Sequence, residues 1–344
     1  RQILAINPSR MQFDTQPKAA FVERFGFRGV SADGRYAFLL EHSLQKNAQN
    51  EVTLTVLLVC FDKKTTKTHT IYEQEPVSLA QQKQFLAQKT WQNCVFSFAS
   101  GAFFEINHDN LRGKLHSHLG SVSWHLRLHR QHQVWQLKNP LWYWLKKWPA
   151  YKVQLADSKI KYLGKIQTPD LDLATDFLGS SFHYWGAGHP AEYAFAECHH
   201  FNSSREGFFC GFSRRASLGP RFTLPYFSMA SFKIGQKTYH FQELKHCVRH
   251  KVTALDDYRW HISYQNAHYI LDVEIEGANP RLMPWVSWQS ASVAIKTTDF
   301  AQGKFTLYRR DTLEVEESLL SEVVTLQTHL PENMTHEPSY WLIP

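Results

Sequence analysis

Apolar and polar residues alternate along much of the chain, with the period of two that half-buried β-strands show. The alternation is clearest in the segment 121–130. There the apolar residues Val122, Trp124, Leu126 and Leu128 alternate with the polar residues Ser123, His125, Arg127 and His129. The pattern predicts a strand with one face in a core and the other face in solvent.

Further strands are predicted wherever β-branched and aromatic residues cluster between turn residues. They cover 36–41, 52–59, 94–98, 103–107 and 110–115 in the first half, and 194–198, 207–212, 231–234, 238–241, 260–264, 269–275, 292–296 and 304–308 in the second. One helix is predicted, over 79–89, because strong helix formers are concentrated there. Many short strands with turns between them predict an all-β fold of antiparallel barrels or sandwiches.

The length of the chain predicts two domains. Its 344 residues exceed the size at which one hydrophobic core stops growing. The segment 139–151 is bracketed by prolines and lacks periodicity, so it is interpreted as the connection between the domains. We therefore expect an N-terminal domain over 1–150 and a C-terminal domain over 151–344, packed in tandem.

Composition and charge narrow the choice of ligand. Aromatic residues make up 14% of the chain, which favours strands or an apolar pocket. The net charge is +7 and the pI about 9.0, but the basic clusters are short and no nucleic-acid-binding motif surrounds them. We expect a hydrophobic small molecule as partner, and no nucleic acid.

Cofactor and metal motifs are missing from the sequence. It has no phosphate-binding glycine loop, no nucleophile elbow and no H-E-x-x-H motif, so no cofactor is expected. Histidine pairs occur at 116/118, 125/129 and 199/200, but none has an evident third ligand, so no metal is expected either. Solvent-facing strand residues are the alternative interpretation of these histidines.

The five cysteines are odd in number and have no C-x-x-C pairing, which indicates free thiols in a reducing compartment. The longest apolar runs are far shorter than the roughly 20 residues that a membrane helix needs. A cytoplasmic or peripheral membrane location is expected, although a signal peptide removed before Arg1 would leave no trace in this sequence.

The segment 179–201 concentrates titratable, aromatic and glycine residues. His183 and Trp185 are two apart, so both side chains point to one face of an extended chain. A histidine beside an indole can donate a proton to an alkene and stabilise the developing carbocation. Glu192 is near enough in sequence to assist. The alternative is a core tryptophan beside a hydrogen-bonded histidine.

Several short motifs resemble one superfamily. They are the segment 25–38 with its Ser-x-Asp-Gly turn, Leu111-Arg-Gly, Trp124-His-Leu, His183-Tyr-Trp-Gly, Gly188-His-Pro and the aromatic strand 193–201. This order is similar to that of the lipocalin-like superfamily of tocopherol cyclase, the bacterial carotenoid 1,2-hydratase (hydroxyneurosporene synthase) and fungal decalin-forming Diels-Alderases. The resemblance implies two lipocalin-like domains that enclose a cavity for an isoprenoid- or lipid-like molecule.

The resemblance also suggests site residues. His183 and Trp185 match the signature of the hydratase, and we take them with Glu192 as candidate catalytic residues. Tyr184, Tyr193, Phe195, Trp124 and Phe208 are the expected ligand-binding residues. The hydratase also uses a Tyr and an Asp, and the matching stretch 208–212 contains neither. Binding without chemistry is therefore our leading prediction, and a cofactor-independent cyclase or hydratase is the alternative.

The segment 142–148 combines Trp142, Trp144 and Trp148 with two lysines. Indole rings with flanking lysines suit the membrane interface, where such a segment would form a portal for an isoprenoid. The alternative is that these rings cover the seam between the domains. The sequence does not define an oligomeric state.

Overall fold

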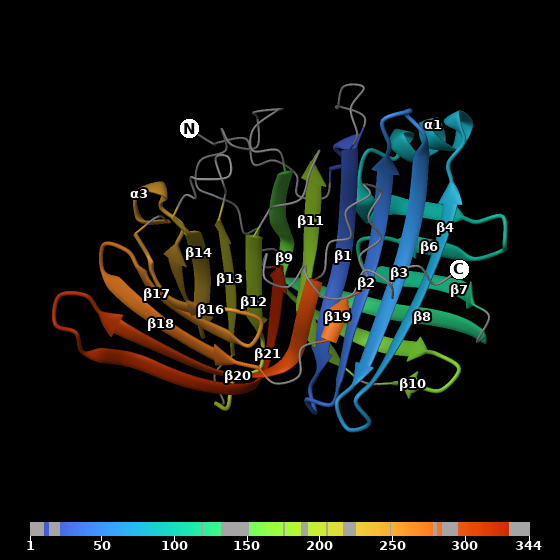
Figure 1. The fold of residues 1–344 in the computed structure, drawn as a ribbon. Helices are drawn as coiled ribbons and strands as arrows, with labels where there is room; N and C mark the ends of the chain where they lie inside the picture. Colours follow the sequence, from blue (N-terminus) through green and yellow to red (C-terminus); the bar gives the residue numbers. More distant parts are fainter. Residues whose placement is uncertain are drawn as a thin grey trace. The chain divides into compact units, whose positions relative to one another are not determined.

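The computed structural model describes residues 10–13, 21–117, 120–131, 151–174, 176–186, 192–203, 206–215, 225–247, 249–277, 281–283 and 295–329. The chain divides into two compact units, Arg1–His189 and Pro190–Pro344 (Figure 1). Nearly all of the described residues in regular structure are in antiparallel strands. The all-β prediction is therefore confirmed.

The first unit contains β1 (Phe21–Ser31), β2 (Tyr36–Lys46), β3 (Val52–Asp62), β4 (Lys67–Pro76), α1 (Leu79–Ala87), the 3₁₀ helix η2 (Trp91–Asn93), β5 (Cys94–Ser97), β6 (Phe103–Ile106), β7 (Asn110–Ser117), β8 (Gly120–Gln131), β9 (Tyr151–Gln167), β10 (Asp172–Leu173) and β11 (Phe177–Gly186). Its strands form one sheet in the order β4-β3-β2-β1-β11-β9-β8-β7-β6-β5, with β10 paired to β9. The last strand, β11, pairs with the first strand, β1.

The second unit contains β12 (Glu192–Cys198), β13 (Gly207–Arg215), β14 (Phe227–Ile234), β15 (Lys237–Phe241), α3 (Leu244–Cys247), β16 (Lys251–Leu255), β17 (Arg259–Gln265), β18 (Tyr269–Glu276), β19 (Arg281–Met283), β20 (Ile295–Arg309) and β21 (Val315–His329). The sheet order is β15-β14-β13-β12-β21-β20-β18-β17-β16, with β19 paired to β20. Here too the last strand pairs with the first, β21 with β12.

The two units repeat one topology. In each, four strands form a meander, a short helix leads to a second meander, and the final strand returns to the first. Each sheet is therefore continuous and curled. Its two edge strands are the strands that come immediately before and immediately after the helix in sequence. This arrangement gives two lipocalin-like domains in tandem, as predicted.

Long bent strands allow each sheet to fold over itself. The first part of β9 pairs with β11 and its last part pairs with β8, and the register shifts near Ser181 mark a β-bulge at the bend. In Figure 1, β1 to β4 run upright while β6 to β8 cross them. The first core lies between these two layers of one sheet.

Side chains join the two free edges of the first sheet. Glu75 of β4 accepts a hydrogen bond from the Ala99 backbone at 2.7 Å. Glu73 accepts from the Ser100 hydroxyl and, at 3.4 Å, from the His116 backbone. These carboxylates thus link β4 to the turn after β5 and to the end of β7 without a backbone ladder.

The alternation predicted for 121–130 is confirmed in β8. Val122, Trp124, Leu126 and Leu128 are buried in the first core, whereas His125, Arg127 and His129 are exposed. Trp124 lies over Gly113 of the neighbouring strand, so closely that a Cβ at Gly113 would approach its ring to 2.1 Å. Glycine is required at 113 because the indole fills the space of a side chain.

The boundary between the two units lies later in the chain than residue 150, where the sequence analysis placed it. Strands β9 and β11 complete the first sheet by pairing with β8 and β1, which keeps them in the first unit. The segment 139–151, interpreted as the connection, lies outside the described residues except for Tyr151, which is the first residue of β9. Strands β4, β9, β10, β16, β19 and β21 were not predicted. Of the two segments predicted at 292–296 and 304–308, the described residues 295–296 and 304–308 belong to the single strand β20.

Among the described residues, no helix has the length and apolar character needed to cross a membrane.

Substitution of Gly113 by Ala should destabilise the first unit by about 1–3 kcal/mol, because the new methyl group collides with Trp124. Denaturant unfolding of Gly113→Ala, Trp124→Leu and the double variant measures this. The double variant should be more stable than the sum of the single effects predicts, since Leu leaves room for the methyl. Simple additivity would contradict the contact.

Candidate functional site

Strand β11 carries the candidate residues of the first unit. Trp185 belongs to the first core and His183 packs edge-on against the Phe25 ring, so both face the interior of the sheet. Their ring centroids lie 4.6 Å apart, which confirms that the two side chains share a face. Phe25 is in register with His183 on one side and with His42 of β2 on the other. Three strands therefore place two histidines in one row across Phe25.

The Glu23 carboxylate is the centre of the hydrogen bonding around His183. His183 Nε2 lies 2.8 Å from Glu23 Oε1, and neither side chain is exposed to solvent. The indole N–H of Trp91 donates to the same oxygen at 2.8 Å. The backbone N–H of Gln12 donates to Oε1 at 2.9 Å and to Oε2 at 3.0 Å. One buried carboxylate thus joins β1, β11, η2 and the segment 10–13.

Aromatic rings surround this carboxylate and histidine. Trp91 stacks on Phe25 with an angle of 4° between the rings and a centroid distance of 5.9 Å. Phe25 in turn contacts Phe27 edge-to-face at 5.3 Å. Hydrogen bonds to a polar group in such surroundings are strong, because little water competes for them.

A second buried polar cluster lies two residues along β11. Ser181 Oγ donates to Asp157 Oδ2 at 2.8 Å, and Arg130 Nη1 contacts the same oxygen at 2.5 Å. The Arg130 and Asp157 side chains are each 2% exposed. The guanidinium lies over the Phe27 ring, with Cζ 5.9 Å from its centroid. Sequence reasoning missed this cluster because its members belong to strands far apart in the chain.

His42 is a third buried polar group of this interior. It contacts Phe104 at 4.5 Å and Phe27 at 6.4 Å between ring centroids. Burial lowers its pKa from 6.5 to about 3, and the nearby Phe25 backbone opposes the shift only in part. His42 is thus neutral at physiological pH.

The other predicted ligand-binding residues do not converge on this interior. Trp124 is core packing over Gly113, and Tyr184 lies on the face of β11 opposite His183. Tyr193, Phe195 and Phe208 alternate with residues of the second core and so lie on the opposite face of β12 and β13, where they are buried.

Four candidates cannot be placed. The backbone of Glu192 belongs to β12, but its side chain lies outside the described residues. The predicted portal residues Trp142, Trp144 and Trp148 also lie outside them. Their roles remain predictions.

The histidine pairs form no metal centre in the part of the chain that the structure describes, where no group of three or more ligating side chains occurs. His125 and His129 face solvent, in agreement with the alternative interpretation. His199 is buried 3.6 Å from Glu197, and His118 lies outside the described residues.

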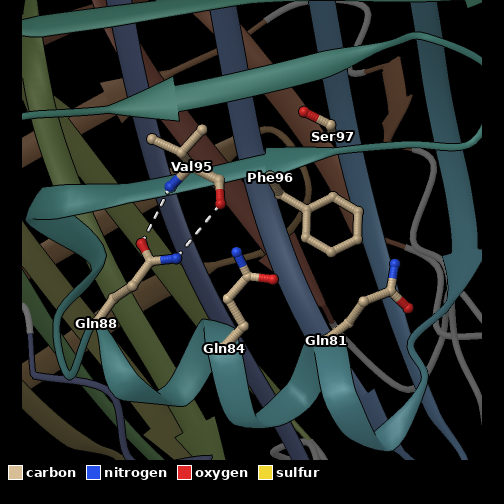
Figure 2. Close-up of a pocket in the computed structure, with 6 residues that line it drawn as sticks. All are labelled: Gln81, Gln84, Gln88, Val95, Phe96 and Ser97. Atoms are coloured by element: carbon tan, nitrogen blue, oxygen red, sulfur yellow. Dashed lines mark hydrogen bonds between the residues drawn. The ribbon is translucent and has the colours of Figure 1, made fainter.

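Figure 2 shows a pocket of about 260 Å³ between α1 and β5. The Gln88 amide accepts from the Val95 N–H at 3.1 Å and donates to the Val95 carbonyl at 3.4 Å. Because β5 is an edge strand, this amide replaces a neighbouring strand at Val95. A second pocket of the same volume lies on the second unit, around Gly303 and Lys304. Neither pocket is lined by a predicted site residue.

The comparisons with known proteins concern the fold. No protein-family model matches the chain, and no curated protein matches it. A crystal structure of CghA with Sch210972 is similar, with a TM-score of 0.53, 8% identity, and coverage of 90% of this chain and 89% of that chain. A putative AttH from Nitrosomonas europaea has a TM-score of 0.53 at 10% identity, covering 94% of this chain and 98% of that one.

At these identities the likeness concerns the fold alone. It extends over most of each chain, so both units belong to the compared region. The class that the topology and these comparisons define is a protein with a lipocalin-like fold.

Stability should fall as the pH drops from 6.5 to about 4. Burial lowers the pKa of His42 to about 3 and that of His250 to about 4, so the unfolded chain binds more protons in this window. Each histidine contributes a slope of about 1.4 kcal/mol per pH unit. Denaturant unfolding across this range should show a smaller slope for His42→Leu and an unchanged slope for the exposed His125→Leu. An unchanged slope in His42→Leu would refute the assignment.

Replacing Glu23 by Leu should cost about 3–5 kcal/mol, because the N–H groups of Gln12 and Trp91 and the His183 ring lose a buried acceptor. Unfolding followed by tryptophan fluorescence measures the loss, and hydrogen exchange at the Gln12 amide should accelerate. Glu51→Leu, at an exposed position of the same unit, is the control and should change stability by less than about 0.5 kcal/mol. Equal effects of the two substitutions would contradict a central role for Glu23.

Proposed function

We propose that the protein binds a hydrophobic, isoprenoid- or lipid-like small molecule, and that the first unit provides the binding interior. One observation carries the proposal. Five ionisable side chains, Glu23, His42, Arg130, Asp157 and His183, are buried among aromatic rings of a single sheet. Ionisable residues are rarely buried for packing alone, and clusters of them in aromatic surroundings are typical of binding or catalytic sites.

The fold supports the same proposal. Curled antiparallel sheets of this kind enclose small apolar ligands between their layers. CghA, which has a similar fold, has been crystallised with Sch210972. The aromatic rings around Phe25 and Phe27 offer apolar and π contacts to a ligand, and the polar side chains on β11 offer orientation.

The second candidate function is proton donation to a prenyl double bond. It is favoured by the contact between His183 and Trp185 at 4.6 Å, since an indole face stabilises a developing carbocation. Ring closure or water addition would then follow without a cofactor. Glu23 would hold the imidazole in place through its contact with Nε2.

The position of His183 Nε2 favours binding over this chemistry. That nitrogen lies 2.8 Å from Glu23, so the proton on it points at a carboxylate rather than at a ligand. The carboxylate is in turn held by the N–H groups of Trp91 and Gln12. Such a fully bonded pair supports an anchoring role for His183.

Incubation with geranylgeraniol in D₂O separates the two functions. We expect a 1:1 complex in native mass spectrometry and recovery of the alcohol without carbon-bound deuterium. Protonation of a double bond would leave deuterium on carbon in the product. Gain of deuterium that disappears in His183→Gln but persists in the exposed control His125→Gln would establish the second function. No complex with geranylgeraniol or with other prenyl lipids would refute both.

A further inference from the structure

Two buried side chains of the first unit, Arg130 and His42, have ring or guanidinium nitrogens that make no hydrogen bond of normal geometry with a described residue. Arg130 Nη2 has no hydrogen-bond partner, although the side chain is only 2% exposed. Neither ring nitrogen of the fully buried His42 makes a hydrogen bond of normal geometry, although the Phe25 backbone is close enough to raise the pKa of the ring in part. Buried polar groups are almost always bonded, so each exception requires an explanation.

The two groups lie against the same aromatic ring. The Arg130 guanidinium lies 5.9 Å from the Phe27 ring centroid, and the His42 ring lies 6.4 Å from it, nearly perpendicular. Phe27 is in register with Ser181, whose hydroxyl is bonded to Asp157. The guanidinium of Arg130 and the neutral imidazole of His42 thus both lie close to the Phe27 ring.

Arg130 is held in a fixed position from two sides. Its Nε donates to the carbonyl of His108, in the turn between β6 and β7, at 2.8 Å. Its Nη1 contacts Asp157, which leaves Nη2 as the guanidinium nitrogen without a hydrogen-bond partner. A guanidinium that is held in a fixed position and has one nitrogen without a partner is suited to donate hydrogen bonds to a negatively charged oxygen of a ligand.

We propose that Arg130 and His42 form a binding site for the carboxylate head of a fatty-acid-like ligand in the interior of the first unit. This inference rests on the proposed function and specifies its ligand class. The carboxylate would satisfy Arg130 Nη2 and accept from the His42 ring, while the hydrocarbon tail packs on the aromatic residues around Phe27. The charge-assisted hydrogen bond is the strongest contact that such a head group makes in this site.

A neutral head group fits the same position less well. An alcohol or ester presents no negative charge to the guanidinium, and hydrogen bonds between charged partners are about twice as strong as neutral ones. Asp157 neutralises part of the charge of Arg130, so we expect a moderate preference. A tenfold difference in Kd corresponds to about 1.4 kcal/mol.

The test compares oleate, oleyl alcohol and methyl oleate by displacement of a fluorescent fatty probe. In the wild-type protein, oleate should bind about tenfold more tightly than either neutral analogue. In Arg130→Met this ratio should fall toward one while the alcohol still binds. In Arg130→Lys it should also fall, because the single ammonium group stays paired with Asp157 and has no second nitrogen for the ligand. His42→Phe should weaken oleate binding severalfold. Arg127→Met, an exposed substitution on the same strand, is the matched control and should keep the wild-type ratio.

The outcomes separate the inference from the function on which it rests. Equal affinity for oleate and oleyl alcohol in the wild-type protein would overturn the carboxylate site and leave hydrophobic binding intact. Binding of none of the three lipids would refute both. Thermal unfolding of each variant identifies those that fail to fold, and Arg130→Lys, which preserves the charge beside Asp157, keeps the test decisive if Arg130→Met unfolds.

Discussion

The bonds to the buried Glu23 carboxylate are the interaction on which the first unit depends most. A carboxylate without solvent exposure is tolerated only when its oxygens are occupied, and here N–H groups from Gln12 and Trp91, together with His183, occupy them. Glu23 and His183 alone are 160 positions apart in the chain. The convergence of these groups fixes the segment 10–13 and η2 against β1 and β11. It also fixes His183 beside Trp185.

The same constraint explains why polar residues are found in an aromatic interior. A sheet that is filled with rings alone would be easier to stabilise, because each buried ionisable group must be matched by a partner. Glu23 is matched by His183 and its N–H donors, and Asp157 by Arg130 and Ser181. The ring of His42 and the Nη2 atom of Arg130 make no hydrogen bond of normal geometry. The interior thus contains buried nitrogens that remain available for hydrogen bonds to a ligand, which supports a ligand-binding role.

Much of the fold could be predicted from sequence because strand alternation is a local property. The faces of β8 and the shared face of His183 and Trp185 follow from spacing, and the helix α1 follows from its local composition. The exposed strand β4 escaped prediction because its residues are mostly polar, and the boundary between the units was placed early because β9 was not recognised as a partner of β11.

The site was less predictable because the relevant partners are set by register between distant strands. Nothing near His183 in sequence indicates Glu23, and nothing near Arg130 indicates Asp157. Alternation does imply that Tyr184 cannot share a face with His183, and the structure places it accordingly.

NMR of the imidazole nitrogens during titration with a prenyl or fatty lipid shows whether the interior of the first unit is the ligand-binding region. We predict saturable shifts for His183 and His42, with no change for the exposed His125 and His129. Saturable binding that leaves the signals of His183 and His42 unchanged would contradict this prediction.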